Sequence, residues 1–329
     1  MAGCGERAQQ AASGGSTAAG DPAAGFLGAH WARPLAGQGV PPAGFTPQEA
    51  SLHPQDCGAC HQDQYRDWSR SLHSRAMGPG LLGQLVNMDA AASDEHQDCI
   101  RCHAPLKEQA QSLAASLADP PRKTAPGADI PPLHTQGLVC AACHVRGHRV
   151  YGPKRRDGSV AEAAGFPHGG WIASSAFEDS RFCAACHQFE KDGFALNGKL
   201  LENTHEEWKA SRHAREGRSC QSCHMPDRRH LWRGIHDPGM TKQGIEVSPT
   251  PLRIEAGQVI AALRIKNTGA GHYFPTYVTP QVIVRSRQET AAGEILKNTA
   301  QDYVIGRRVT QDLSREVFDT RLAPDEERS

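Results

Sequence analysis

The chain of 329 residues carries 36 basic and 36 acidic side chains, and this balance gives no electrostatic reason to expect nucleic acid or an anionic membrane surface as a partner. Hydrophobic residues make up only 38% and aromatic residues 6% of the chain, so side-chain packing alone is a weak basis for a core. Eleven cysteines and 17 histidines are unusual in number, and so many thiols indicate metal binding or covalent modification.

Residues 1–50 consist mostly of Ala, Gly, Ser, Pro and Gln, a composition that predicts a flexible N-terminal tether. Near its start, the residues Ala2, Gly3, Cys4 and Gly5 resemble the end of a lipoprotein box. Cys4 is therefore a candidate lipid anchor, and a free thiol is the alternative.

The next part of the chain contains five copies of the pattern Cys-x-x-Cys-His, numbered here motifs 1 to 5, which use ten of the eleven cysteines. They are Cys57, Cys60 and His61; Cys99, Cys102 and His103; Cys140, Cys143 and His144; Cys183, Cys186 and His187; and Cys220, Cys223 and His224. This spacing is the attachment signature of c-type haem. Two thiols on one turn reach the two vinyl groups, and the following histidine coordinates the iron. Five copies predict five covalently bound haem c groups and argue strongly against a zinc site or a thioredoxin-like pair.

Twelve histidines lie outside the motifs, and at most five of them are needed as second axial ligands. A second imidazole closes the iron to small molecules and suits electron transfer. The candidates are His73, His168, His213, His236 and His272.

The first and third candidates come from one repeated pattern. Residues 62–77 predict an amphipathic helix that ends in His73. Its segment W-S-R-S-L-H, at 68–73, recurs as W-K-A-S-R-H at 208–213, which indicates a reused structural element that ends in His213.

The other three candidates depend on their local sequence. His168 lies in F-P-H-G-G, where the glycines would let the backbone approach a flat macrocycle. His230 and His236 both follow motif 5 closely enough to fold back, and His236 is the preferred ligand. His272 lies in the turn N-T-G-A-G-H-Y-F-P-T, and the alternative to a ligand role is that it is an ordinary loop residue.

The predicted fold has two parts. Residues 51–242 should form a mainly helical and loop-rich multihaem domain, with short helices such as 98–118 and the haems as its core. Residues 243–329 show strand-like alternation and predict an immunoglobulin-like β-sandwich. Because the chain stops after a turn and such a sandwich needs about 100 residues, we expect a truncated or partnered C-terminus.

The motif contexts C-G-A-C-H-Q-D-Q-Y-R-D-W-S-R-S-L-H, G-L-V-C-A-A-C-H and S-C-Q-S-C-H-M-P resemble the multihaem superfamily of the nitrification tetrahaem cytochrome and hydroxylamine oxidoreductase. The resemblance covers roughly residues 51–240 and strengthens His73 and His272 as distal ligands. It implies haem attachment after export, hence a periplasmic or cell-surface location. No lysine-type attachment motif and no matching cross-linking tyrosine are present, so a catalytic haem is unsupported.

Three functions remain open. The leading hypothesis is an electron carrier with five six-coordinate irons that works between redox protein partners. The second is an oxidoreductase with one open haem that acts on a small nitrogen or sulfur compound. The third is a wire or assembly subunit, in which the β-domain docks to a membrane complex or to another copy of the chain.

Overall fold

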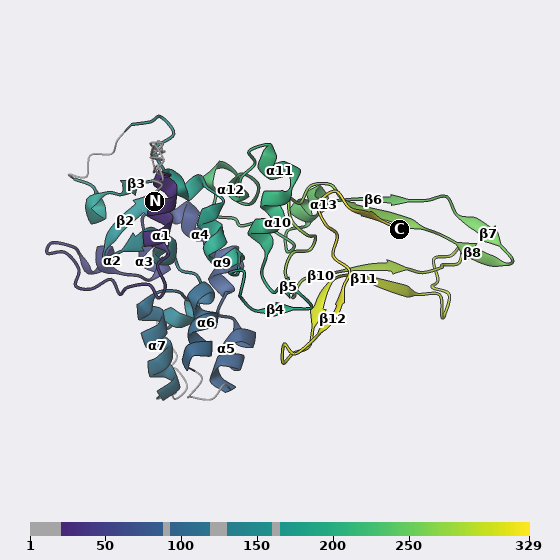
Figure 1. Cartoon of the computed structure of the whole chain (residues 1–329), viewed down its shortest axis with the longest axis horizontal. Helices are drawn as coiled ribbons and strands as arrows, with labels where there is room; N and C mark the ends of the chain where they lie inside the picture. Colours follow the sequence, from purple (N-terminus) through teal and green to yellow (C-terminus); the bar gives the residue numbers. More distant parts are fainter. Residues whose placement is uncertain (1–20, 88–92, 119–129, 160–164) are drawn as a thin grey trace, which may run out of the picture.

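The computed structural model describes residues 21–87, 93–118, 130–159 and 165–329. Short helices dominate the N-terminal two thirds, and strands dominate the rest (Figure 1). The helices are α1 Pro22–His30, α2 Pro47–Ala50, α3 Pro54–Gly58, α4 Gln62–Arg70, α5 Pro79–Asn87, α6 Ser93–His103, α7 Lys107–Ala118, α8 Cys140–His144, α9 Arg181–His187, α10 Thr204–Ala210, α11 Arg212–Arg215, α12 Cys220–His224 and α13 Pro238–Gly244. Within these ranges, no helix has the length and apolar character needed to cross a membrane.

The strands form small sheets. In the helical part, β1 Val145–Arg146, β2 Arg149–Gly152 and β3 Ile172–Ala173 make one sheet, and β4 Ala195–Leu196 pairs with β5 Lys199–Leu200. The C-terminal strands are β6 Ile245–Pro249, β7 Arg253–Glu255, β8 Gln258–Ile260, β9 Leu263–Asn267, β10 Gln281–Ser286, β11 Gln301–Val309, β12 Glu316–Asp319 and β13 Glu327–Arg328. Their orders are β13-β9-β6, β10-β11-β12 and β7-β8.

The C-terminal domain is a small two-layer β structure (Figure 1). Ile265 of β9 and Ile305 of β11 are buried in one apolar cluster with Leu322, and Val282 and Val284 of β10 pack against it. In the antiparallel β10–β11 pair, Val282 lies opposite Ile305, so both side chains point to the same face. Residues from both three-stranded sheets therefore share this core.

Part of the predicted tether is built into the helical domain. Asp21 caps α1 by accepting hydrogen bonds from the backbone N–H groups of Ala23 and Ala24. Leu27 of α1 is 9% exposed and packs with Ala176 and Phe182. Residues 22–30 therefore pack against the haem-motif segments, and the apolar side chains of α1 explain why. Cys4 lies outside the described residues.

Two local predictions differ from the structure. The helix expected over 98–118 is broken between α6 and α7 at Pro105, because proline lacks the N–H that a continuous helix needs. The nine-residue strand β11 was not predicted from its sequence, Q-D-Y-V-I-G-R-R-V. Its alternation is hidden because Arg307 occupies an inward, fully buried position.

Buried ion pairs join the β-domain to the helical domain. Arg307 is 0% exposed, forms an ion pair with Glu316 at 2.8 Å and donates to the carbonyl oxygen of Leu200 at 2.6 Å. Lys199 of β5 reaches Glu316 at 2.8 Å and Asp319 at 2.7 Å. Because a buried charge is tolerated only when it is paired, this network fixes how the two domains meet.

The pKa of Asp319 shows that this network stabilises the ionised form of its carboxylate. Burial by itself would raise the pKa of Asp319, but hydrogen bonds from Arg321 and Lys199 outweigh burial and hold the pKa well below its ordinary value. The carboxylate therefore stays ionised at neutral pH, and the domain contact is retained.

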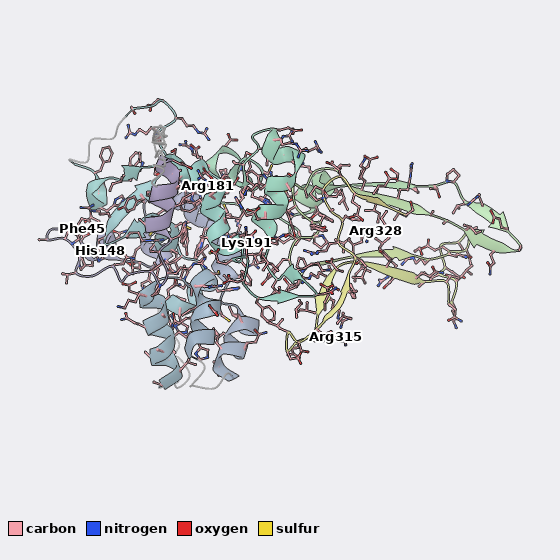
Figure 2. The ribbon with its side chains drawn as sticks, viewed as in Figure 1. Phe45, His148, Arg181, Lys191, Arg315 and Arg328 are labelled. Carbon is pink, nitrogen blue, oxygen red and sulfur yellow. The ribbon has the colours of Figure 1, made fainter. Side chains whose placement is uncertain are left out.

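The substitution Arg307→Ala should remove one of the two cations that pair with Glu316 and leave the Leu200 carbonyl oxygen without its donor. We expect the free energy of unfolding to fall by about 1–3 kcal/mol, as when one partner of a buried hydrogen bond is removed. Arg315→Ala is the matched control, because Arg315 is exposed in the β11–β12 hairpin (Figure 2). Urea unfolding followed by circular dichroism measures both. Equal midpoints for the two variants would contradict a structural role for the buried pair.

Candidate haem sites

Each motif places its two thiols and its histidine on or beside a short helix. Motifs 3 and 5 coincide with α8 and α12, while motifs 2 and 4 form the last turns of α6 and α9. In motif 1, Cys57 lies in α3 and His61 precedes α4. No disulfide uses any of the ten motif cysteines. The structure thus presents the two thiols and the imidazole together, as thioether attachment and iron coordination require.

Four motif histidines each face a second imidazole. The ring centroids of His61 and His168 are 6.4 Å apart, and those of His187 and His73 are 6.3 Å apart. The pairs His144 with His230 and His224 with His272 have centroids 6.0 and 6.2 Å apart.

These separations fit an iron between the rings. An imidazole nitrogen binds a first-row metal at roughly 2.0–2.1 Å, and the ring centroid lies on the order of 1 Å behind that nitrogen, so two axial imidazoles keep their centroids about 6 Å apart. A direct hydrogen bond between the two rings would bring them closer. The residues present therefore fit a haem iron at each of these four places.

Hydrogen bonds orient the rings for coordination. The Nδ1 atoms of His144, His168 and His272 donate to the carbonyl oxygens of Tyr151, Gly170 and Tyr273 at 2.8, 2.9 and 2.8 Å. His224 and His230 donate to Arg233 and Arg228 in the same way. Because a carbonyl oxygen only accepts, each Nδ1 carries the proton and each Nε2 keeps its lone pair. This is the arrangement of metal-bound histidine.

Burial keeps three of the facing imidazoles, those of His73, His230 and His272, neutral. Desolvation lowers the pKa of His73 to about 3, and it lowers the pKa of His230 and of His272 to about 4. Nearby histidines, such as His187 beside His73, add to this effect. At neutral pH these rings are in the deprotonated form that binds a metal.

The structure brings three of the five predicted distal histidines, His73, His168 and His272, face to face with a motif histidine. His236 is exposed and its ring faces no motif histidine, whereas His230 lies opposite His144. The geometry therefore favours His230 over the predicted His236. His213 is buried, but it too faces no motif histidine.

The choice between His230 and His236 was open in the sequence, since both follow motif 5. The deciding feature is Asp67, which accepts a hydrogen bond from the backbone N–H of His230 at 3.1 Å and is held by Arg229. This contact joins residues 163 positions apart. No local pattern reveals it.

His103 differs from the other four motif histidines. Its Nδ1 donates to the Ala76 carbonyl oxygen at 2.7 Å, which leaves Nε2 free as in a coordinating ring. Yet no imidazole lies opposite it, although the described ranges contain all 17 histidines. The site at motif 2 therefore offers one imidazole where the others offer two.

The attachment sites lie next to one another. Three pairs of thiols from different motifs lie close enough to shift each other's pKa: Cys57 with Cys140, Cys102 with Cys186, and Cys183 with Cys220. Motif 1 is thus beside motif 3, and motifs 2 and 5 are both beside motif 4. Cys143 of motif 3 is also close enough to disfavour ionisation of the motif 4 thiols. The five sites form one connected, branched array.

Repeated attachment motifs, facing neutral imidazoles and helices that form around them define a multihaem c-type cytochrome with covalently bound haem c. The family "Cytochrome c554 and c-prime" matches residues 56–144, which include motifs 1 to 3. The penta-heme cytochrome c552 from Thermochromatium tepidum has a similar structure, with a TM-score of 0.58 at 21% identity, covering 86% of this chain and 87% of that chain. This likeness shows a shared fold. No curated protein matches the sequence.

A His230→Ala variant should leave the haem at motif 3 with one imidazole, so one haem becomes high-spin and binds carbon monoxide when reduced. His236→Ala is the control, because the exposed His236 faces no motif histidine, and its spectrum should match the wild type. Optical spectra of the oxidised, reduced and carbon monoxide-treated proteins measure this. The opposite result, one more high-spin haem than the wild type in His236→Ala and none more in His230→Ala, would restore the ligand favoured by sequence.

Proposed function

We propose that this protein holds five haem c groups and transfers single electrons between redox protein partners. The four facing imidazole pairs carry this proposal. Haem iron accepts and releases one electron, and two axial imidazoles keep it closed to other ligands in both states. A closed iron in a rigid site is suited to electron transfer and unsuited to substrate chemistry.

The chain's own residues supply the rest of this function. Backbone carbonyl oxygens fix the imidazole rings, so little rearrangement is needed when charge changes. The connected order of the attachment sites supports an internal relay in which motif 4 is the junction. Cys60 and His61 of motif 1 are exposed in the described chain, which makes this end a suitable contact point for a redox partner.

A second function is favoured at motif 2. Because His103 has no imidazole opposite it, a haem held there could bind and transform a small nitrogen or sulfur compound. The chain would then act as an oxidoreductase whose other haems deliver electrons. The superfamily resemblance to hydroxylamine oxidoreductase is compatible with this alternative.

Location and assembly remain proposals. Covalent haem attachment is expected after export, which supports a periplasmic or cell-surface protein, with Cys4 as a possible lipid anchor. The β-domain, whose immunoglobulin-like character is also a proposal, could dock to a membrane complex or to another copy. Ion-paired contacts between the domains support a fixed rather than a mobile attachment.

Carbon monoxide binding separates the two functions. Intact mass should show five haems, and carbon monoxide should shift the spectrum of one reduced haem. If no haem shifts, motif 2 is closed by another ligand and the oxidoreductase alternative is rejected. If two or more shift, closed imidazole pairs do not describe the protein and the electron-transfer proposal fails.

Paired cysteine variants assign the shift. Cys99→Ala with Cys102→Ala should remove one haem and the carbon monoxide signal together. Cys57→Ala with Cys60→Ala, the matched control, should remove one haem and keep the signal. Retention of the signal in the motif 2 variant would place the open iron elsewhere.

A further inference from the structure

The sequence echo between Trp68–His73 and Trp208–His213 is a repeat in the structure. Ser71 and Ser211 each end a helix and donate their backbone N–H to the carbonyl oxygen of the preceding tryptophan at 2.9 Å. Their backbone angles agree, with φ −80° and ψ 166° at Ser71 and φ −79° and ψ 167° at Ser211. The two segments therefore leave their helices in the same direction.

Both copies hold the following haem motif in the same way. Trp68 Nε1 donates to the Leu138 carbonyl oxygen at 2.7 Å, and Trp208 Nε1 donates to that of Arg218 at 2.9 Å. Leu138 lies two residues before motif 3, and Arg218 lies two residues before motif 5. The backbone N–H groups of Leu138 and Arg218 then donate to the carbonyl oxygens of His73 and His213, each at 2.9 Å.

Further details agree between the copies. The arginine two residues after each histidine folds back onto a backbone carbonyl, with Arg75 donating to Arg70 at 2.8 Å and Arg215 to Ala210 at 3.0 Å. A glycine with positive φ precedes each clamped residue: Gly137 has φ 66° and Gly217 has φ 72°. Each copy is thus one unit that presents a histidine and anchors the next motif.

The copies differ in what the histidine faces. The first copy anchors motif 3, and its His73 lies opposite His187, the histidine of motif 4. His213 has no such partner, because no motif histidine of the described residues lies opposite its ring. Both rings nevertheless have a buried Nδ1 with no hydrogen-bond partner. His213 is only 6% exposed, so the packing around it holds its ring in place. The first copy places His73 opposite a motif histidine, whereas the second copy holds His213 with no such histidine opposite it.

We propose that His213 is an axial ligand position for a haem iron supplied from outside this chain, as on a partner c-type cytochrome with one open coordination position. The surrounding charges suit a haem edge, because Arg212, Arg215 and Arg218 flank His213 and a haem carries two propionate carboxylates. Arg212 is already paired, with Asp325 at 3.0 Å and Glu216 at 3.7 Å, and Arg218 pairs with Glu216 at 3.1 Å. No carboxylate reaches Arg215 among the ion pairs of the described residues, so Arg215 is the cation left for a propionate.

Titration with a soluble haem c peptide that has one axial imidazole and one open position tests this directly. The wild-type holoprotein should convert the high-spin peptide to a low-spin form, with a stoichiometry of one per chain. His213→Ala should weaken this binding by more than the roughly 10–100-fold that follows loss of an outer-shell partner of a metal ligand. Equal conversion by His213→Ala, or no conversion by the wild type, would overturn the proposal.

His236→Ala is the matched control, because it removes an exposed histidine that lies outside the repeat, and it should bind the peptide as the wild type does. Loss of binding in this control would instead identify His236 as an adventitious ligand and overturn the assignment to His213. Intact mass and the optical spectrum check that both variants keep their own haems. The mass and the spectrum report on the protein's own haems and do not depend on the peptide titration. Failure of the proposed function and failure of this proposal are therefore distinguishable.

Discussion

Two imidazoles whose ring centroids lie about 6 Å apart, with no hydrogen bond between them, leave a space that an iron bound to both rings would fill. Four such pairs organise the helical domain, and each joins segments that are distant in the sequence. Side-chain packing gives little independent support, because the apolar core of the described residues is divided among small clusters. Coordination and haem burial therefore replace the single hydrophobic core that most domains of this size use.

The β-domain belongs to this arrangement because it supplies one of the facing imidazoles. His272 reaches His224 from the turn after β9, and Asn267 at the end of β9 donates to the His272 carbonyl oxygen at 3.0 Å. Buried ion pairs from Arg307 and Lys199 hold the domain where this reach is possible. The position of this imidazole thus depends on an electrostatic contact between domains, and the β-domain has a structural role at motif 5.

The attachment motifs could be recognised from sequence because their chemistry is local: two thiols and one imidazole must lie on a single turn. His73, whose ring lies opposite that of His187, was also singled out by a local pattern, since a helix leads to it, and its role as an iron ligand stays a prediction. The choice of His230 over His236 was not predictable, because it depends on Asp67 and Arg229, which meet only in the folded chain. The same limit applies to β11, where buried Arg307 interrupts the apolar alternation and finds its partners in β5 and β12.

Electron paramagnetic resonance of the fully oxidised protein, with integration of the low-spin ferric signals against the total haem content, tests the central claim most directly. The facing imidazoles predict four low-spin haems per chain with two axial nitrogen ligands. Fewer than four such haems would contradict the account, because at least one facing pair would then not share an iron.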